Sequence, residues 1–325
     1  MDYHIIGDIH GQADKLEGLL QHLGYRLVDG VYQQTAVKAA FLGDFIDRGD
    51  QHRRVLNIVR PMIEQGYAMG VMGNHEFNAI CYHTKHPETL GPLRPHHEYN
   101  IKQHQCFLDE YGLHEEDARE IIEWFKTLPV YWEVKDGQGK VLFRMVHACW
   151  NRTIVNRVPQ YLTQDFIVEA STEGMQAYDD IEVLLKGPEI PLSGDVSFED
   201  KDGHPRRSIR VQWWNEKRPV SYREIAMVPE EVRSNLPSTF VEDADLDRFG
   251  YPASEPPVFI GHYWLTGKPV PIRTNVACLD YSAGKGGKLV AYHWREGDQG
   301  PLRQERFVAV DGYQAPRMID GHRVE

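Results

Sequence analysis

The feature that most constrains this chain is a pattern repeated three times near its amino terminus, in which an apolar run ends on glycine and a polar side chain. The runs at residues 3–6, 38–42 and 67–72 lead into the segments GDIHG (7–11), GDFIDRG (43–49) and GNHE (73–76). Between them, apolar residues at helical spacing predict helices over residues 12–23 and 55–63. This alternation predicts an α/β fold, a sheet covered by helices. In such sheets, the polar side chains that follow the strands gather at the strands' carboxyl ends.

Two later segments interrupt the alternation. Residues 77–128 are polar and helical in pattern, and we expect them to form a helical excursion beside the strand ends. Strands are expected again at residues 130–134, 141–147, 258–261, 276–279 and 289–294. Residues 150–257 lack regular alternation and predict an insertion or lid, with its tip at residues 199–203. We therefore expect one elaborated domain over residues 1–325.

Histidines and tryptophans in these two segments allow more than one interpretation. The histidines of the excursion predict a solvent-exposed helical surface rather than a third metal site, because their spacings fit no ligand pattern; they are His83, His86, His96, His97 and His104. Trp213 and Trp214 are expected in the core under the insertion, with a place in a substrate cleft as the alternative.

Charge and composition exclude several classes of protein. The net charge of −12 argues against nucleic acid as a partner, because it leaves no broad basic face. No apolar stretch approaches the ~20 residues of a membrane span, and the first residues lack the layout of a signal peptide. The four cysteines are scattered and form no CxxC pair, which predicts reduced thiols. We expect a cytoplasmic protein without a membrane partner.

The polar side chains at the strand ends are of the types that hold metal ions. Asp8 and His10 follow the first strand, Asp44 the second and Asn74 the third, and two later strands end at His147 and His262. This set offers oxygen and nitrogen ligands without thiolate, which suits Mn²⁺, Fe or Zn²⁺ better than Ca²⁺. With Asp44 as a bridge, the six side chains predict a site for two divalent ions. Such a pair can hold a bridging hydroxide and bind the oxygens of a phosphoryl group.

Three further residues of the same segments predict catalysis by direct attack of that hydroxide. His75 adjoins a ligand and is placed to protonate the leaving oxygen, and Asp47 can hold its ring in the protonated state. Arg48 offers the forked donor that phosphate oxygens prefer. A purely structural ion pair is the alternative role for these residues.

Together these segments closely resemble those of the calcineurin-like metallophosphoesterases, in the branch of Ser/Thr protein phosphatases and symmetrical diadenosine tetraphosphatases. The resemblance covers residues 2–80, 140–150 and 257–294. It implies a central β-sandwich flanked by helices and the same metal ligands. It also implies the same roles for Asp47, His75 and Arg48.

Two positions depart from the family pattern. Bacterial phosphatases of this kind have a second phosphate-binding arginine directly after a Trp-Asn pair, whereas Glu216 stands there in this chain. The candidate replacements are Arg210, Lys217 and Arg218. In place of the usual threonine after the final histidine, Tyr263 and Trp264 offer aromatic walls that can stack on a base or a phenyl group.

The main functional hypothesis is a phosphatase that hydrolyses phosphate monoesters, with a phosphorylated protein or a small phosphorylated molecule as substrate. The alternative is a hydrolase of dinucleoside polyphosphates, for which the aromatic wall is the hint. A remote alternative is a phosphate-binding scaffold without catalysis, but a scaffold has no need of the proton donor His75.

Overall fold

The computed structural model describes residues 1–192, 197–199, 205–298, 300–311, 318–319 and 322–323. The expected tip of the insertion at residues 199–203 lies outside these residues except for its first position. Within the described part, no helix has both the length and the apolar character needed to cross a membrane.

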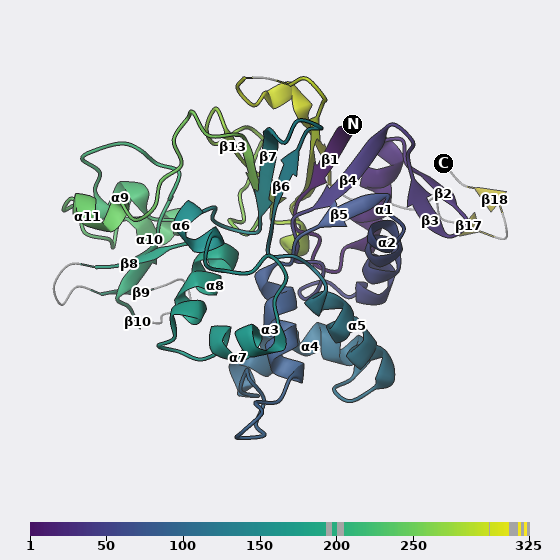
Figure 1. Ribbon diagram of the computed structural model, residues 1–325, viewed down its shortest axis with the longest axis horizontal. Helices are drawn as coiled ribbons and strands as arrows, with labels where there is room; N and C mark the ends of the chain where they lie inside the picture. The colour runs from purple at the N-terminus through teal and green to yellow at the C-terminus, as the bar shows by residue number, and fades with distance from the viewer. Residues whose placement is uncertain (193–196, 200–204, 299, 312–317, 320–321, 324–325) are drawn as a thin grey trace.

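The first sheet contains the three strands predicted from the apolar runs near the amino terminus (Figure 1). β1 (Asp2–Ile6), β4 (Val37–Phe41) and β5 (Ala68–Gly70) are parallel to one another. β15 (Lys288–Trp294) pairs antiparallel with β1, and β14 (Asp280–Tyr281) and β16 (Phe307–Val310) pair with β15. Because the three parallel strands run in one direction, their carboxyl ends meet at a single edge.

The second sheet has the order β13-β12-β7-β6. β6 (Tyr131–Lys135) and β7 (Val141–Val146) form an antiparallel hairpin. β12 (Val258–Ile260) pairs parallel with both β7 and β13 (Val276–Cys278). Residues far apart in the sequence, His147 and His262, therefore leave this sheet at the same edge.

The two sheets share one apolar layer, so they form a β-sandwich. Ile5 of β1, Ala40 of β4, Phe143 of β7 and Phe259 of β12 belong to the same buried cluster. Their neighbours, such as Ile6, point the other way into a second cluster that the helices cover. Because the strands are buried on both faces, they consist of nearly continuous apolar runs. The predicted fold class is confirmed.

Helices cover the outer faces of the sandwich. α1 (Ala13–His22) and α2 (His52–Glu64) occupy the predicted positions and bury their apolar stripes. The excursion consists of α3 (Asn74–His83), α4 (Glu98–Tyr111) and α5 (Glu116–Lys126). The expectation that the histidines of this segment lie on an exposed surface is wrong for His104, which is 5% exposed.

The segment 150–257 contains short helices and strands with an apolar cluster of its own. Its elements are α6 (Arg152–Val155), α7 (Gln164–Ala170), α8 (Gln176–Lys186), β8 (Glu189–Pro191), β9 (Phe198–Glu199), β10 (Pro205–Arg206), β11 (Ser208–Arg210), α9 (Tyr222–Ile225), α10 (Glu230–Arg233) and α11 (Asp243–Leu246). Ile190, Ile209, Val220 and Leu236 belong to the separate cluster. Figure 1 shows α9, α10 and α11 on the opposite side of the sheets from α1 and α2.

Small elements outside these layers include a hairpin that the sequence pattern did not predict, β2 (Arg26–Val28) with β3 (Val31–Gln33). The side chains of β2 are exposed, so its sequence carries no apolar alternation. The remaining elements are the short helices η1 (Ala283–Lys285) and η2 (Gln304–Arg306) and the strands β17 (Met318–Ile319) and β18 (His322–Arg323).

Candidate active site

The loops after the parallel strands place the predicted ligands around one cavity of about 150 Å³. Five of the six line it, from segments that span most of the chain: Asp8, His10, Asp44, Asn74 and His262. The sixth, His147, is fully buried beside Asp44. The edge that the strand directions define is thus the place where all six side chains meet.

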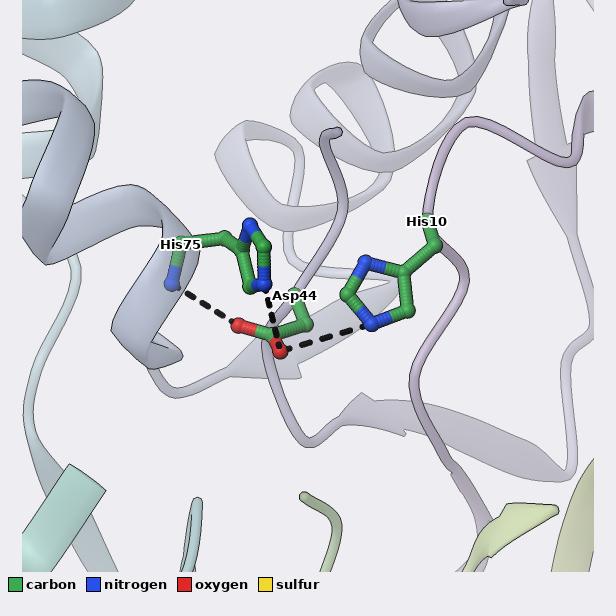
Figure 2. Close-up of side chains that lie close together, drawn as sticks. All are labelled: His10, Asp44 and His75. Atoms are coloured by element: carbon green, nitrogen blue, oxygen red, sulfur yellow. Dashed lines mark hydrogen bonds and ion pairs between the residues drawn. The ribbon is translucent and has the colours of Figure 1, made fainter. Parts of the chain in front are cut away.

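Asp44 lies at the centre of this cluster. Its Oδ2 atom lies 3.5 Å from His10 Nε2 and 3.3 Å from His147 Nε2. Its Oδ1 atom accepts a hydrogen bond of 3.0 Å from the backbone N–H of His75. Figure 2 shows the His10 ring reaching this carboxylate from a loop and the His75 ring reaching it from a helix. One carboxylate therefore faces groups from several separate segments.

Hydrogen bonds to backbone carbonyls determine the orientation of two of these imidazole rings. His10 Nδ1 donates to the carbonyl of Ile46 at 3.0 Å, and His147 Nδ1 donates to the carbonyl of Leu42 at 2.7 Å. In the neutral rings, Nε2 then presents a lone pair toward the Asp44 carboxylate. Burial lowers the pKa of His147, but the Asp44 carboxylate outweighs burial and raises this pKa to about 10. Either a proton or a metal cation is thus needed between these acceptors.

Two buried polar atoms of the cluster have no hydrogen-bond partner within the described residues, Asp8 Oδ1 and His262 Nε2. Nearby, the backbone N–H of His262 donates to Asp8 Oδ2 at 3.0 Å, and Asn74 Oδ1 lies 2.8 Å from His262 Nδ1 and 3.1 Å from His147 Nε2. Buried polar atoms without partners are rare and costly, and a cation would satisfy them. The donor set therefore fits divalent metal ions. Two groups have all their ligand atoms within 4.8 Å of one another: His10, Asp44 and His75, and Asp44, His147 and His262.

Backbone strain is concentrated at the same place. Several non-glycine residues at the site have left-handed φ angles between 36° and 71°: His10, Asp44, Asp47, Arg48, His262, Trp264 and Ser282. Each such conformation costs about 1–3 kcal/mol, and it persists where the surrounding structure holds it. Six of these seven residues line the cavity, and the seventh, Asp47, contacts the cavity residue His75.

Two glycines let the loops approach the carboxylates closely. A Cβ atom on Gly261 would lie 2.0 Å from Asp8 Oδ1, and one on Gly73 would lie 2.1 Å from Asp44 Oδ1. Neither position has room for a side chain, because the nearest atoms belong to predicted ligands. The glycines in these segments are thus part of the geometry of the site.

His75 is held by two carboxylates. Its Nδ1 donates to Asp47 Oδ2 at 2.6 Å, and its Nε2 lies 3.9 Å from Asp44 Oδ2. Burial lowers the pKa of His75, but the carboxylates of Asp44 and Asp47 outweigh burial and raise this pKa above its usual value. An imidazolium in this position can donate a proton from Nε2 into the cavity.

Cationic and aromatic side chains form the rim of the cavity. Arg48, Arg210, Lys285 and Trp264 all line it. Arg210 comes from β11 of the insertion, and its side chain is 19% exposed. Its Nε atom is buried and has no hydrogen-bond partner in the described part of the chain. Among the predicted substrate-binding residues, Arg210 and Trp264 thus reach the cavity.

The structure places the other predicted substrate-binding residues elsewhere. Lys217 pairs with Glu224, and Arg218 lies 3.6 Å from Asp243. The Tyr263 ring is fully buried, and its hydroxyl accepts a hydrogen bond from Trp213 Nε1 at 3.0 Å. None of the three lines the cavity that the described residues form.

The expectation that both tryptophans lie in the core is confirmed, since Trp213 and Trp214 are 2% and 4% exposed. Glu216, which occupies the position of the family's arginine, pairs with Arg273 at 2.5 Å. Glu216 therefore does not line the cavity that the described residues form.

Sequence reasoning missed three buried polar residues that support the site. Glu76 accepts hydrogen bonds of 2.8 Å from the backbone N–H groups of Gly73, Asp44 and Phe45, and so ties two ligand loops together. Asp280 lines the cavity and accepts bonds from the backbone N–H groups of Trp264 and Ser282. His104 contacts Asp47. The position of Asp280 after the apolar run at 276–279 is the one available sequence signal, since it repeats the strand-then-aspartate pattern.

Comparison with known proteins shows the family of this chain. The sequence profile described as calcineurin-like phosphoesterase matches residues 1–248. The chain belongs to this family. The family resemblance of the sequence segments is therefore confirmed.

The proteins similar to this chain include two bis(5'-nucleosyl)-tetraphosphatases and a protein-tyrosine phosphatase. A symmetrical bis(5'-nucleosyl)-tetraphosphatase of Baumannia cicadellinicola is 26% identical over 318 residues, which cover 91% of this chain and 90% of that protein. An asymmetrical bis(5'-nucleosyl)-tetraphosphatase of Oceanobacillus iheyensis is 38% identical over 76 residues, 23% of this chain. The matched segment spans 30% of the length of that relative. The crystal structure of a cold-active protein-tyrosine phosphatase from a Shewanella species covers 90% of this chain and 75% of its own, with 19% identity and a TM-score of 0.47.

Proposed function

We propose that this chain is a metal-dependent hydrolase that cleaves the phosphoanhydride bonds of dinucleoside polyphosphates. One observation carries the proposal: three cationic side chains and an aromatic ring surround the cavity that holds the predicted metal ligands. Arg48, Arg210 and Lys285 come from three separate segments, and the Trp264 ring beside them is 37% exposed. A polyphosphate chain carries several negative charges, and a nucleoside base stacks on an exposed indole.

Space beyond the cavity supports a substrate larger than one phosphoryl group. Arg210 also lines an open groove of about 770 Å³, where Tyr178 and Phe249 supply further aromatic rings. A cavity of about 150 Å³ has room for the reacting phosphate, while the rest of the substrate must extend outward past the rim. The names of the two tetraphosphatase relatives point to the same substrate class.

Each group in the site would have a separate role in the hydrolysis. Two divalent ions, of Mn, Fe or Zn, would supply Lewis acidity at the phosphoryl oxygens and activate a water molecule. Arg48 and Arg210 would hold the phosphate oxygens through charge-assisted hydrogen bonds. His75 would donate its Nε2 proton to the leaving oxygen, with its ring held by Asp47.

Incubation with diadenosine tetraphosphate and each metal in turn, followed by anion-exchange chromatography, tests the proposal. Two ADP molecules would indicate symmetrical cleavage, and AMP with ATP would indicate asymmetrical cleavage. Replacing Trp264 by alanine should raise KM for this substrate about tenfold through lost stacking. The matched control is Tyr161→Ala, because Tyr161 is also exposed but does not line the cavity. Absence of nucleotide products with every metal would refute the proposal.

A second candidate function is the hydrolysis of phosphate monoesters, such as phosphorylated side chains of proteins. The observation that favours it is the pair of His75 with Asp47 at 2.6 Å. A serine or threonine alkoxide is a poor leaving group and needs a proton, whereas a nucleotide phosphate is a good leaving group and needs it less. The kcat/KM values for a phosphoserine peptide and for diadenosine tetraphosphate, measured side by side, decide between the two substrates.

The remaining alternative is a scaffold that binds phosphate without catalysis. It predicts that metal and phosphate bind with full occupancy by calorimetry while no ester or anhydride is cleaved. Turnover of any substrate that Asp44→Asn abolishes would exclude this alternative, because Asp44 is the shared member of both groups of ligand atoms.

A further inference from the structure

Asp47 accepts hydrogen bonds from two imidazoles, one on each oxygen. Its Oδ2 accepts from His75 Nδ1 at 2.6 Å, and its Oδ1 accepts from His104 Nδ1 at 2.9 Å. All three side chains are nearly buried, since Asp47 is 3%, His75 9% and His104 5% exposed. The carboxylate is therefore held in one rotation, with a separate donor on each side.

His104 belongs to α4 of the helical excursion, and its own orientation is restrained by packing. Its ring stacks on Phe107 with centroids 4.7 Å apart and an interplanar angle of 16°. The centroid of the Tyr82 ring of α3 lies 5.2 Å from that of His104. The donor that reaches Asp47 is thus carried by a rigid element rather than by a loose surface side chain.

A third histidine continues the chain of hydrogen bonds. His83 Nε2 lies 3.1 Å from His104 Nε2. The proton of this contact can belong to either ring, and in both cases His104 Nδ1 donates to Asp47, because a carboxylate oxygen only accepts. Both ring nitrogens of His104 therefore have a partner, Asp47 on one side and His83 on the other.

We propose that His104 is a positioning residue for the proton donor, which acts by holding Asp47 so that Asp47 orients His75. The inference rests on the proposed hydrolysis of phosphate bonds. Water loses one proton and attacks phosphorus as hydroxide, and the bond between phosphorus and the leaving oxygen breaks. That oxygen takes the proton from His75 Nε2, and the proton released by water restores His75 through the solvent. Without His104, Oδ1 of Asp47 loses its donor and the carboxylate is free to rotate, which misaligns the His75 ring.

Aryl phosphates with different leaving groups test this role. His104→Phe keeps an aromatic ring against Phe107 but removes the donor, whereas His104→Asn restores an N–H near the Nδ1 position. For phenyl phosphate, whose leaving group needs a proton, His104→Phe should lower kcat/KM about tenfold or more. For p-nitrophenyl phosphate, whose leaving group does not, the loss should be below about threefold. His104→Asn should recover most of the loss.

Controls separate the possible failures. His97→Phe changes an exposed histidine at the start of the same helix and should leave both substrates unaffected. If the wild-type protein hydrolyses neither aryl phosphate nor diadenosine tetraphosphate, the proposed function fails. If it is active and His104→Phe lowers both aryl phosphates equally, the role is merely structural and this inference is overturned.

A second measurement works without activity. In the metal-free protein, the downfield proton resonance of the His75 Nδ1–H bond should shift or broaden in His104→Phe and stay unchanged in His97→Phe. If His104→Phe does not fold, His104→Gln replaces it, because its amide extends past the Nδ1 position and should fail where His104→Asn succeeds. Equal behaviour of the Gln and Asn variants in both measurements would overturn the inference.

Discussion

Replacing Arg210 by alanine should weaken substrate turnover while leaving the folded protein almost as stable. In the free protein the guanidinium has one distant ion-pair partner, Glu189 at 3.5 Å, and its buried Nε has no hydrogen-bond partner in the described part of the chain. Such a partly exposed pair contributes about 1 kcal/mol or less. With substrate bound, a charge-assisted hydrogen bond contributes about 1.5–3 kcal/mol, which corresponds to a loss of about 10- to 150-fold in kcat/KM.

The assay compares kcat/KM of three proteins on diadenosine tetraphosphate and p-nitrophenyl phosphate, with thermal melting as a check on folding. Arg210→Lys keeps the charge but loses the forked geometry, so it should fall between the wild type and alanine. Arg207→Ala is the matched control, since Arg207 is exposed in the same segment but does not line the cavity.

Wild-type kcat/KM of Arg210→Ala on both substrates would refute the binding role of Arg210, and so would a loss no greater than that of Arg207→Ala. A large drop in melting temperature would also contradict it, because the structure shows little for this side chain to stabilise in the free protein.

Three further changes test other parts of the site and core. Gly261→Ala should displace the Asp8 carboxylate, since its Cβ would lie 2.0 Å from Oδ1, and should lower the bound metal measured by elemental analysis; unchanged metal content would contradict the assigned ligand. Glu76→Gln should destabilise the protein by about 1–3 kcal/mol in urea unfolding, because an amide cannot accept all three backbone N–H bonds. Burial lowers the pKa of His4 to about 4, so this ring is neutral in the folded protein at pH 7 and its contribution to stability is lost as the pH falls from 6.5 toward 4. The melting temperature of His4→Gln should therefore fall less between pH 7 and pH 5 than that of the wild type. An equal fall in the two proteins would exclude His4 as a source of this pH dependence.

The strands and helices of the sandwich were predictable because burial on both faces leaves continuous apolar runs in the sequence. The third strand was predicted too long, since β5 ends at Gly70. Beyond it, the backbone N–H of Met72 bonds to the carbonyl of Pro129, outside any strand. The sequence pattern did not predict the β2–β3 hairpin, because the side chains of β2 are exposed. The dipeptide Asp29-Gly30, which is typical of hairpin turns, was the one sequence feature that indicated it.

The sequence by itself determined the types and the order of the candidate ligands. Each motif lies within a few residues of a strand end, and parallel strands bring such ends together whatever the rest of the chain does. Asp8, Asp44, Asn74 and His262 could therefore be assigned to one site from their positions in the sequence.

Tertiary structure alone decided which other side chains complete that site. Arg210 and not Lys217 reaches the cavity, and the Tyr263 ring turns into the core while Trp264 stays at the rim. His104 meets Asp47 across 57 residues of sequence, in a segment whose pattern predicted an exposed surface. These outcomes depend on packing between distant segments, and no local spacing of residues encodes such packing.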